Sequence, residues 1–155
     1  MVAWDSLDVP SVEQVHDMIA GADAVLTLLT TKVDDAFLDA AGPQLKVVAN
    51  VAVGYNNIDV AACRSRDVVV TNTPGVLTDA TADIALLLML GAARGAFWGE
   101  RMVRENRWPP ASMVKPLAHD FSRQRLGILG MGRIGAAVAR RAKGFDMQIH
   151  YHNRR

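Results

Sequence analysis

Short apolar runs of strand length alternate with helical segments along the first half of the chain. Runs rich in Val, Ala and Leu, without a polar residue at every second position, are typical of parallel strands buried on both faces. The pattern predicts strands at 24–29, 46–53 and 68–71, and helices at 11–20, 34–41 and 58–66. Ser11 and Gln14 have the spacing of a capping box, and Asp34 is a second candidate N-cap. Because strands alternating with helices indicate βαβ units, we predict an α/β fold with a parallel sheet.

A long helix is predicted in the second half, from Thr78 or Asp79 to about Trp98. Its centre, ALLLML at residues 85–90, is apolar on every side, and such a helix is usually buried on more than one side. A small domain rarely encloses a helix so fully, so we expect this helix to lie at an interdomain or subunit contact. From Pro109 to Gln124 the chain has three prolines and no clear periodicity, which predicts a loop over a cleft.

A glycine-rich turn follows the next apolar run. Gly130, Gly132 and Gly135 fit the G-x-G-x-x-G dinucleotide fingerprint, with a predicted strand before it and a small-residue helix after it. In this motif the first glycine permits a tight turn, the second lets the backbone approach a pyrophosphate, and the third lets the helix pack closely. The free N–H groups and the positive dipole end of the helix then favour phosphate. We therefore predict cofactor binding here, rather than a purely structural turn.

The residues after the second strand of this unit, predicted at 148–151, indicate which dinucleotide is bound. An Asp or Glu about 20 residues after the glycines normally binds the adenosine ribose hydroxyls. That place holds His152, Asn153, Arg154 and Arg155, and Asp146 comes before the strand. Since guanidinium groups pair with a 2′-phosphate that a carboxylate would repel, we predict NADP(H) over NAD(H), with NAD(H) as the second choice. The alternative is a solvated basic turn with no role in binding.

Composition restricts the class of protein. The 155 residues are 50% hydrophobic, enough for a packed core, and the formal net charge of +1 argues against a nucleic-acid surface. Cys63 is the single cysteine, so no internal disulfide is expected and a reducing compartment, the cytoplasm, is the default. The N-terminal residues do not have the pattern of a signal peptide, and the longest apolar run, 84–93, is about half of a membrane span.

Three stretches of the chain resemble one known family. Residues 126–147 are similar to the nucleotide-binding motif of the D-isomer-specific 2-hydroxyacid dehydrogenases, and residues 50–60 and 70–95 are similar to its two other N-terminal signatures. Within the family the likeness is greatest to glyoxylate and hydroxypyruvate reductases. The resemblance implies a flavodoxin-like, parallel-sheet substrate domain at 1–73, followed at 74–155 by the start of a Rossmann dinucleotide-binding domain. It also implies a homodimer formed through the nucleotide-binding domains, without nucleic-acid or membrane partners.

The resemblance assigns roles to individual positions. The backbone N–H groups of Val53 and Gly54 are expected to bind the substrate carboxylate, and Thr81 to approach the cofactor. The remaining cofactor-binding positions are the glycine turn and the end of the second strand: Gly130, Met131, Gly132, Arg133, Ile134, Gly135, Asn153, Arg154 and Arg155. Asn56 stands where many family members have Asp, a change expected to have little effect.

The catalytic Arg, Glu and His of the family lie downstream of the matched region, so no catalytic residue and no metal ligand is predicted in this chain. None of the four histidines has a carboxylate partner placed by a motif, and we do not assign the general acid to His16, His119, His150 or His152. The chain is therefore interpreted as an N-terminal portion of a longer protein, with weak cofactor binding and no turnover of its own.

The predicted reaction is the NADPH-dependent reduction of glyoxylate or hydroxypyruvate to the D-2-hydroxy acid. Two alternatives stay open at this point. One is a different substrate within the family, as in 3-phosphoglycerate or D-lactate dehydrogenase. The other is a non-catalytic, dinucleotide-sensing binding protein like the corepressors related to the family.

Overall fold

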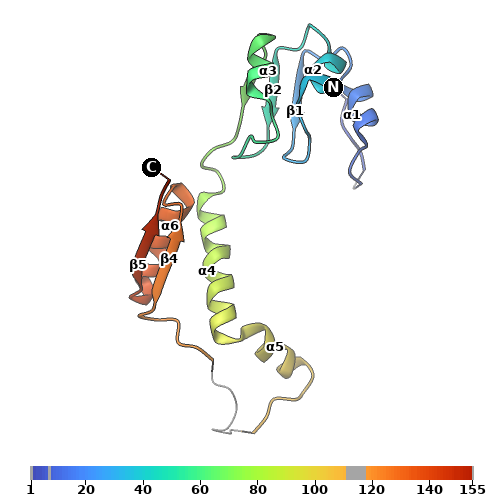
Figure 1. Cartoon of the computed structure of the whole chain (residues 1–155). Helices are drawn as coiled ribbons and strands as arrows, with labels where there is room; N and C mark the ends of the chain where they lie inside the picture. The colour runs from blue at the N-terminus through green and yellow to red at the C-terminus, as the bar shows by residue number, and fades with distance from the viewer. Residues whose placement is uncertain (1, 7, 111–117, 155) are drawn as a thin grey trace. The chain divides into compact units, whose positions relative to one another are not determined.

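The structure is a computed structural model, and it describes residues 2–6, 8–110 and 118–154. The chain divides into two compact units, Met1–Pro74 and Gly75–Arg155. Both units are α/β, and both contain parallel strands, as the sequence predicts. Figure 1 shows the elements of each unit.

The first unit is built on a three-stranded parallel sheet with the order β1-β2-β3 (Figure 1). The strands are β1 (Ala24–Thr27), β2 (Val47–Asn50) and β3 (Val69–Thr71), and the helices are α1 (Val12–Ile19), α2 (Asp35–Ala41) and α3 (Val60–Ser65). Its core includes side chains that are almost completely buried, among them Val33, Phe37, Val48 and Cys63.

Local capping signals place the helices of the first unit. The predicted capping box is present, with the Ser11 hydroxyl accepting from the Gln14 N–H and the Gln14 side chain accepting from the Ser11 N–H. The Asp34 carboxylate accepts from the Phe37 N–H and starts α2, also as predicted. The third helix begins two residues later than predicted, at Val60, because the Asp59 side chain caps it by accepting from the Ala62 N–H.

The sheet of the first unit is not covered on both faces within the described residues, which corrects the expectation of fully buried strands. Val48 is completely buried, whereas Leu26 is 70% exposed and Val69 is 58% exposed. Successive strand residues point to opposite faces, so the helices pack against one face, and the other carries exposed apolar side chains. No strand forms at residues 2–4.

The second unit contains two parallel strands and the helix between them. Its elements are α4 (Thr78–Arg94), α5 (Ala96–Arg104), β4 (Arg125–Leu129), α6 (Arg133–Ala142), the 3-10 helix Lys143–Phe145 and β5 (Gln148–His152). Strands β4 and β5 pair in parallel, and α4 packs along α6 (Figure 1). Small side chains allow this close packing, since Ala82 of α4 and Ala137 of α6 are both fully buried.

The long predicted helix is two helices, which is the main error in the predicted elements. Gly95 adopts a left-handed conformation (φ 62°), and its N–H binds carbonyl groups of the last turn of α4, so the helix ends at Arg94. The chain restarts as α5 at an angle of 68°. Neither helix alone is long and apolar enough to span a membrane, nor is any other helix in the described ranges; the two pass such a test only together.

The apolar centre of α4 is partly exposed in this single chain, so the predicted interdomain or subunit contact stays a prediction. Ala82 and Gly91 are buried, but Leu87 and Leu88 are 59% and 53% exposed. The predicted loop of residues 109–124 is irregular where it is described, and residues 111–117 lie outside the described residues.

Candidate functional site

The glycine turn joins β4 to α6 at the carboxyl end of the strand, the edge where open parallel sheets bind ligands. Gly130 has a φ of +98°, a conformation that glycine adopts readily, and its N–H donates to the His152 carbonyl at 2.8 Å. A Cβ atom on Gly135 would lie 2.2 Å from the Gly130 carbonyl oxygen, so α6 passes against the turn with no room for a side chain. A Cβ on Gly132 would meet no described atom within 4 Å, which leaves space for a ligand beside the backbone.

The first turn of α6 offers free backbone donors. Gly132 is the N-cap, and no side chain caps the helix. The N–H groups of Arg133, Ile134 and Gly135 have no protein acceptor among the described residues. Since the N-terminus of a helix also carries a partial positive charge, this turn has the features of an anion site and fits a pyrophosphate.

The end of β5 lies beside this turn. The Asn153 side-chain oxygen accepts from the Met131 N–H at 2.6 Å. Because the oxygen faces a donor, the Asn153 Nδ2 group faces the other way with its own two donors. Arg154 is exposed directly after it, and within the described part of the chain no carboxylate follows the strand. Arg155 lies outside the described residues.

Thr81 lies in the first turn of α4 and is exposed. Its backbone N–H donates to the Leu77 carbonyl, as expected in a helix. This end of α4 is attached to α6 by Arg141, whose guanidinium binds Asp79 at 3.0 Å and Asp83 at 2.6 Å. Hydrogen bonds with the Asp83 and Asp79 carboxylates raise the Arg141 pKa further above its ordinary value, so the guanidinium stays charged.

Val53 and Gly54 lie in the first unit, in a loop after the carboxyl end of β2. Val53 is half-buried and Gly54 is exposed. Side-chain amides bind both carbonyls, from Asn72 to Val53 at 2.8 Å and from Asn50 to Gly54 at 2.9 Å. The N–H groups of Val53 and Gly54 have no protein acceptor among the described residues, so they remain available to a ligand.

A buried amide network lies beneath this loop, and sequence reasoning missed it. The Thr27 hydroxyl, at the end of β1, donates to the Asn50 side-chain oxygen at 3.0 Å. Asn57 bridges to the preceding loop by donating to the carbonyls of Leu28 and Thr31. Asn50 is 1% exposed. In the sequence, the only sign of this network is a single amide residue among the apolar residues of a predicted strand.

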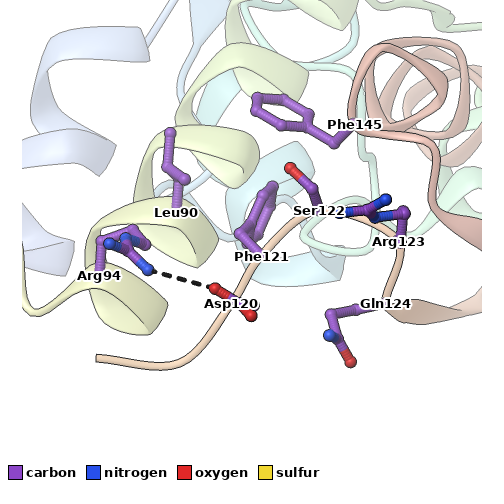
Figure 2. Close-up of a pocket in the computed structure, with 8 residues that line it drawn as sticks. All are labelled: Leu90, Arg94, Asp120, Phe121, Ser122, Arg123, Gln124 and Phe145. Atoms are coloured by element: carbon purple, nitrogen blue, oxygen red, sulfur yellow. Dashed lines mark ion pairs between the residues drawn. The ribbon is translucent and has the colours of Figure 1, made fainter. Parts of the chain in front are cut away.

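The hollow in Figure 2 is a different place from the predicted site. It has a volume of about 580 Å³ and lies in the second unit; Leu90 and Arg94 of α4 and residues 120–124 line it, together with Phe145. Asp120 pairs with Arg94 at 3.7 Å, and the rings of Phe121 and Phe145 meet edge to face (Figure 2). Because it lies at the amino end of β4, away from the glycine turn, we do not assign it to the cofactor. No cluster of metal-ligating side chains occurs in the described ranges.

Comparison with known proteins identifies the family of this chain. Residues 3–148 match the family described as "D-isomer specific 2-hydroxyacid dehydrogenase, catalytic domain". The chain is 47% identical over 151 residues to a glyoxylate reductase of Korarchaeum cryptofilum, covering 97% of this chain and 45% of that protein. It is 43% identical to a glyoxylate reductase of Pyrococcus horikoshii, covering 97% and 46%. The chain therefore spans about half the length of the curated relatives it matches.

Solved structures show the same likeness. A protein of Thermus thermophilus superposes with a TM-score of 0.89 at 38% identity, covering 97% of this chain and 48% of that one. An NADPH-dependent glyoxylate/hydroxypyruvate reductase of Sinorhizobium meliloti, solved with NADP and malonate, superposes with a TM-score of 0.72 at 38% identity, covering 86% and 41%. These matches confirm the α/β fold class and the resemblance seen in the sequence. The chain belongs to the D-isomer-specific 2-hydroxyacid dehydrogenases, a family of oxidoreductases that act on CH–OH groups with NAD(P).

Proposed function

We propose that the protein reduces a small 2-keto acid, glyoxylate or hydroxypyruvate, to the D-2-hydroxy acid with NADPH. In this proposal the first unit binds the substrate carboxylate through the Val53 and Gly54 N–H groups, and the second unit holds the cofactor. The cofactor supplies the hydride. Relatives named as glyoxylate reductases support this substrate class.

The preference for NADPH rests on one observation, the contact between Asn153 and the glycine turn. The Met131 N–H binds the Asn153 oxygen, so the position that follows β5 faces the ribose side of the turn with a neutral amide. Its Nδ2 group can donate to a phosphate, and the Arg154 guanidinium adjoins it. A 2′-phosphate meets donors and a positive charge here, where a carboxylate would have repelled it.

The chain's own contribution is binding and orientation. The N-terminus of α6 takes the pyrophosphate, with Thr81 in the first turn of the neighbouring α4. The family resemblance puts the Arg that polarises the keto acid, and the Glu and His that supply the proton, downstream of residue 155. We therefore propose that residues 1–155 alone bind cofactor without turnover.

Cofactor preference is tested by measuring dissociation constants of the chain for NADPH and NADH by fluorescence titration. We expect NADPH to bind at least about tenfold more tightly, since a charge-assisted hydrogen bond contributes about 1.5–3 kcal/mol. Arg154→Ala should weaken NADPH alone. Arg140→Ala, an exposed arginine on α6, is the matched control and should change neither constant. Tighter binding of NADH by the unchanged chain would overturn the proposed preference.

We also propose that the protein is a cytoplasmic homodimer. The support for the homodimer is the set of exposed apolar side chains on α4 and α5: Leu87 and Leu88 are exposed, and Phe97 and Trp98 are 65% and 54% exposed. Sedimentation velocity tests the association. Leu88→Glu should convert the dimer to a monomer without loss of helix content, and a monomeric unchanged chain would contradict the proposal.

A further inference from the structure

The peptide groups of residues 52–55 are held one after another by their carbonyl oxygens. The Ala52 carbonyl accepts from the Thr73 N–H at 2.9 Å, the Val53 carbonyl from the Asn72 amide at 2.8 Å, and the Gly54 carbonyl from the Asn50 amide at 2.9 Å. The donors come from the carboxyl ends of two neighbouring strands, β2 and β3.

A trans peptide group is planar, with its C=O and its N–H pointing in opposite directions. The described chain has no cis peptide bond. Each held carbonyl therefore fixes the direction of the next residue's N–H, which points away from the donor. Thr73 directs the Val53 N–H in this way, Asn72 directs the Gly54 N–H, and Asn50 directs the Tyr55 N–H.

Of the two amides, that of Asn50 is itself held by other side chains. Asn50 is 1% exposed, and its oxygen accepts from the buried Thr27 hydroxyl at 3.0 Å. Asn57 lies within 3.5 Å of Asn50 and binds the Thr31 carbonyl at 2.9 Å. Each buried side-chain polar atom in the described ranges has at least one partner, so the buried Asn50 amide is restrained from rotating.

We infer that Asn72 and Asn50 are positioning residues, which aim the Gly54 and Tyr55 N–H groups at the substrate carboxylate beside the N–H of Val53. Preorganised N–H donors bind an anion without first having to be ordered, and this lowers the cost of binding. The inference rests on the proposed function, since it requires that this loop binds a carboxylate. It adds a third donor, the Tyr55 N–H, and two side chains that act through the backbone.

The test follows the backbone amide signals of the ¹⁵N-labelled chain during a titration with oxalate, a small dicarboxylate. We expect the signals of Val53, Gly54 and Tyr55 to shift with one saturable curve, and potassium chloride at equal ionic strength to leave them in place. Asn72→Ala should raise the oxalate dissociation constant about three- to tenfold, the range for one net hydrogen bond. In that variant the Gly54 signal should lose its response, whereas the Val53 signal, directed by the Thr73 backbone, should keep it.

A matched control separates positioning from general stability. Gln44→Ala also removes an amide that binds backbone carbonyls, those of Ala22 and Ala41, outside this loop. It should lower the melting temperature and leave oxalate binding unchanged. Asn50→Ala should abolish the Tyr55 response; if that variant does not fold, Asn72→Ala alone decides.

The possible outcomes distinguish the positioning role of Asn72 from the carboxylate site itself. If the unchanged chain shows no shifts at residues 53–55, both this inference and the proposed carboxylate site are wrong. If it binds oxalate and Asn72→Ala binds equally well with an unchanged Gly54 response, the positioning role is wrong and the proposed site stands.

Discussion

Gly135 lies where α6 passes closest to the glycine turn, and a methyl group added there has no room. The Cβ of an alanine would lie 2.2 Å from the Gly130 carbonyl oxygen and 3.2 Å from both the Gly130 carbonyl carbon and the Ile128 Cγ2 atom. An ordinary carbon–oxygen contact is about 3.3 Å, so the start of the helix must move away by about 1 Å.

The size of the effect follows from two opposed contributions. Overpacking of this kind lowers the free energy of unfolding by about 1–3 kcal/mol. The higher helix propensity of alanine offsets up to about 1 kcal/mol of this loss. We expect Gly135→Ala to lower the stability of the Gly75–Arg155 unit by about 1–2 kcal/mol. Amide hydrogen exchange of β4 and β5 measures this unit separately and should become about 5–30 times faster.

Two other glycines provide the comparison. Alanine at Gly132 would meet no described atom within 4 Å, and its φ of −76° suits any residue, so stability should not change. Cofactor binding should nevertheless fall, because the added methyl would occupy the proposed approach of the pyrophosphate. Gly144→Ala, also in open space, should change neither property. Unchanged exchange in Gly135→Ala, or equal destabilisation by Gly132→Ala, would refute the close-packing argument.

Three further predictions concern the first unit. Cys63 is completely buried and burial raises the pKa of its thiol, so a thiol reagent should react with the chain only at the rate at which this unit unfolds. Ser11→Ala should lower the stability of the unit by about 1 kcal/mol in denaturant titration, since it removes the capping box. The Lys32 side chain and the Phe37 N–H lower the pKa of Asp34, so its contribution to stability is complete above about pH 4 and is lost as the pH falls further. Asp34→Asn keeps the cap acceptor and removes the titration, so acid unfolding of this unit followed by circular dichroism should become less steep.

Local signals explain what the sequence could predict. The caps at Ser11 and Asp34 depend on residues three positions apart, and the glycine turn depends on a motif of six positions. Interactions between residues only a few positions apart can be recognised in the sequence itself. The positive φ of Gly130 and the lack of space at Gly135 are the features that the fingerprint predicts for its first and third glycines.

The errors have physical causes as well. Helical periodicity continues through Gly95, yet a glycine can end one helix and begin another at no steric cost, so the pattern could not reveal the break. Strands β1 and β2 end earlier than predicted, at Thr27 and Asn50, because their last residues turn their side chains into the amide network. That network joins residues 23 positions apart, and only the folded sheet brings them together.

Asn153 and Asn72 have the same structural role, which their residue type alone does not reveal. Both follow a parallel strand, and both bind a backbone group of a neighbouring loop at its carboxyl edge. In the sequence, only the missing acid and the adjacent arginines favour NADP(H). The structure adds the direction of the amide: its oxygen meets the Met131 N–H, so its donors face the opposite side. Asn153→Asp would keep that hydrogen bond and replace only the donors by a negative charge. This substitution therefore changes the electrostatics of the proposed ribose site while the glycine turn stays in place, and it should move the cofactor preference toward NADH in the same titration.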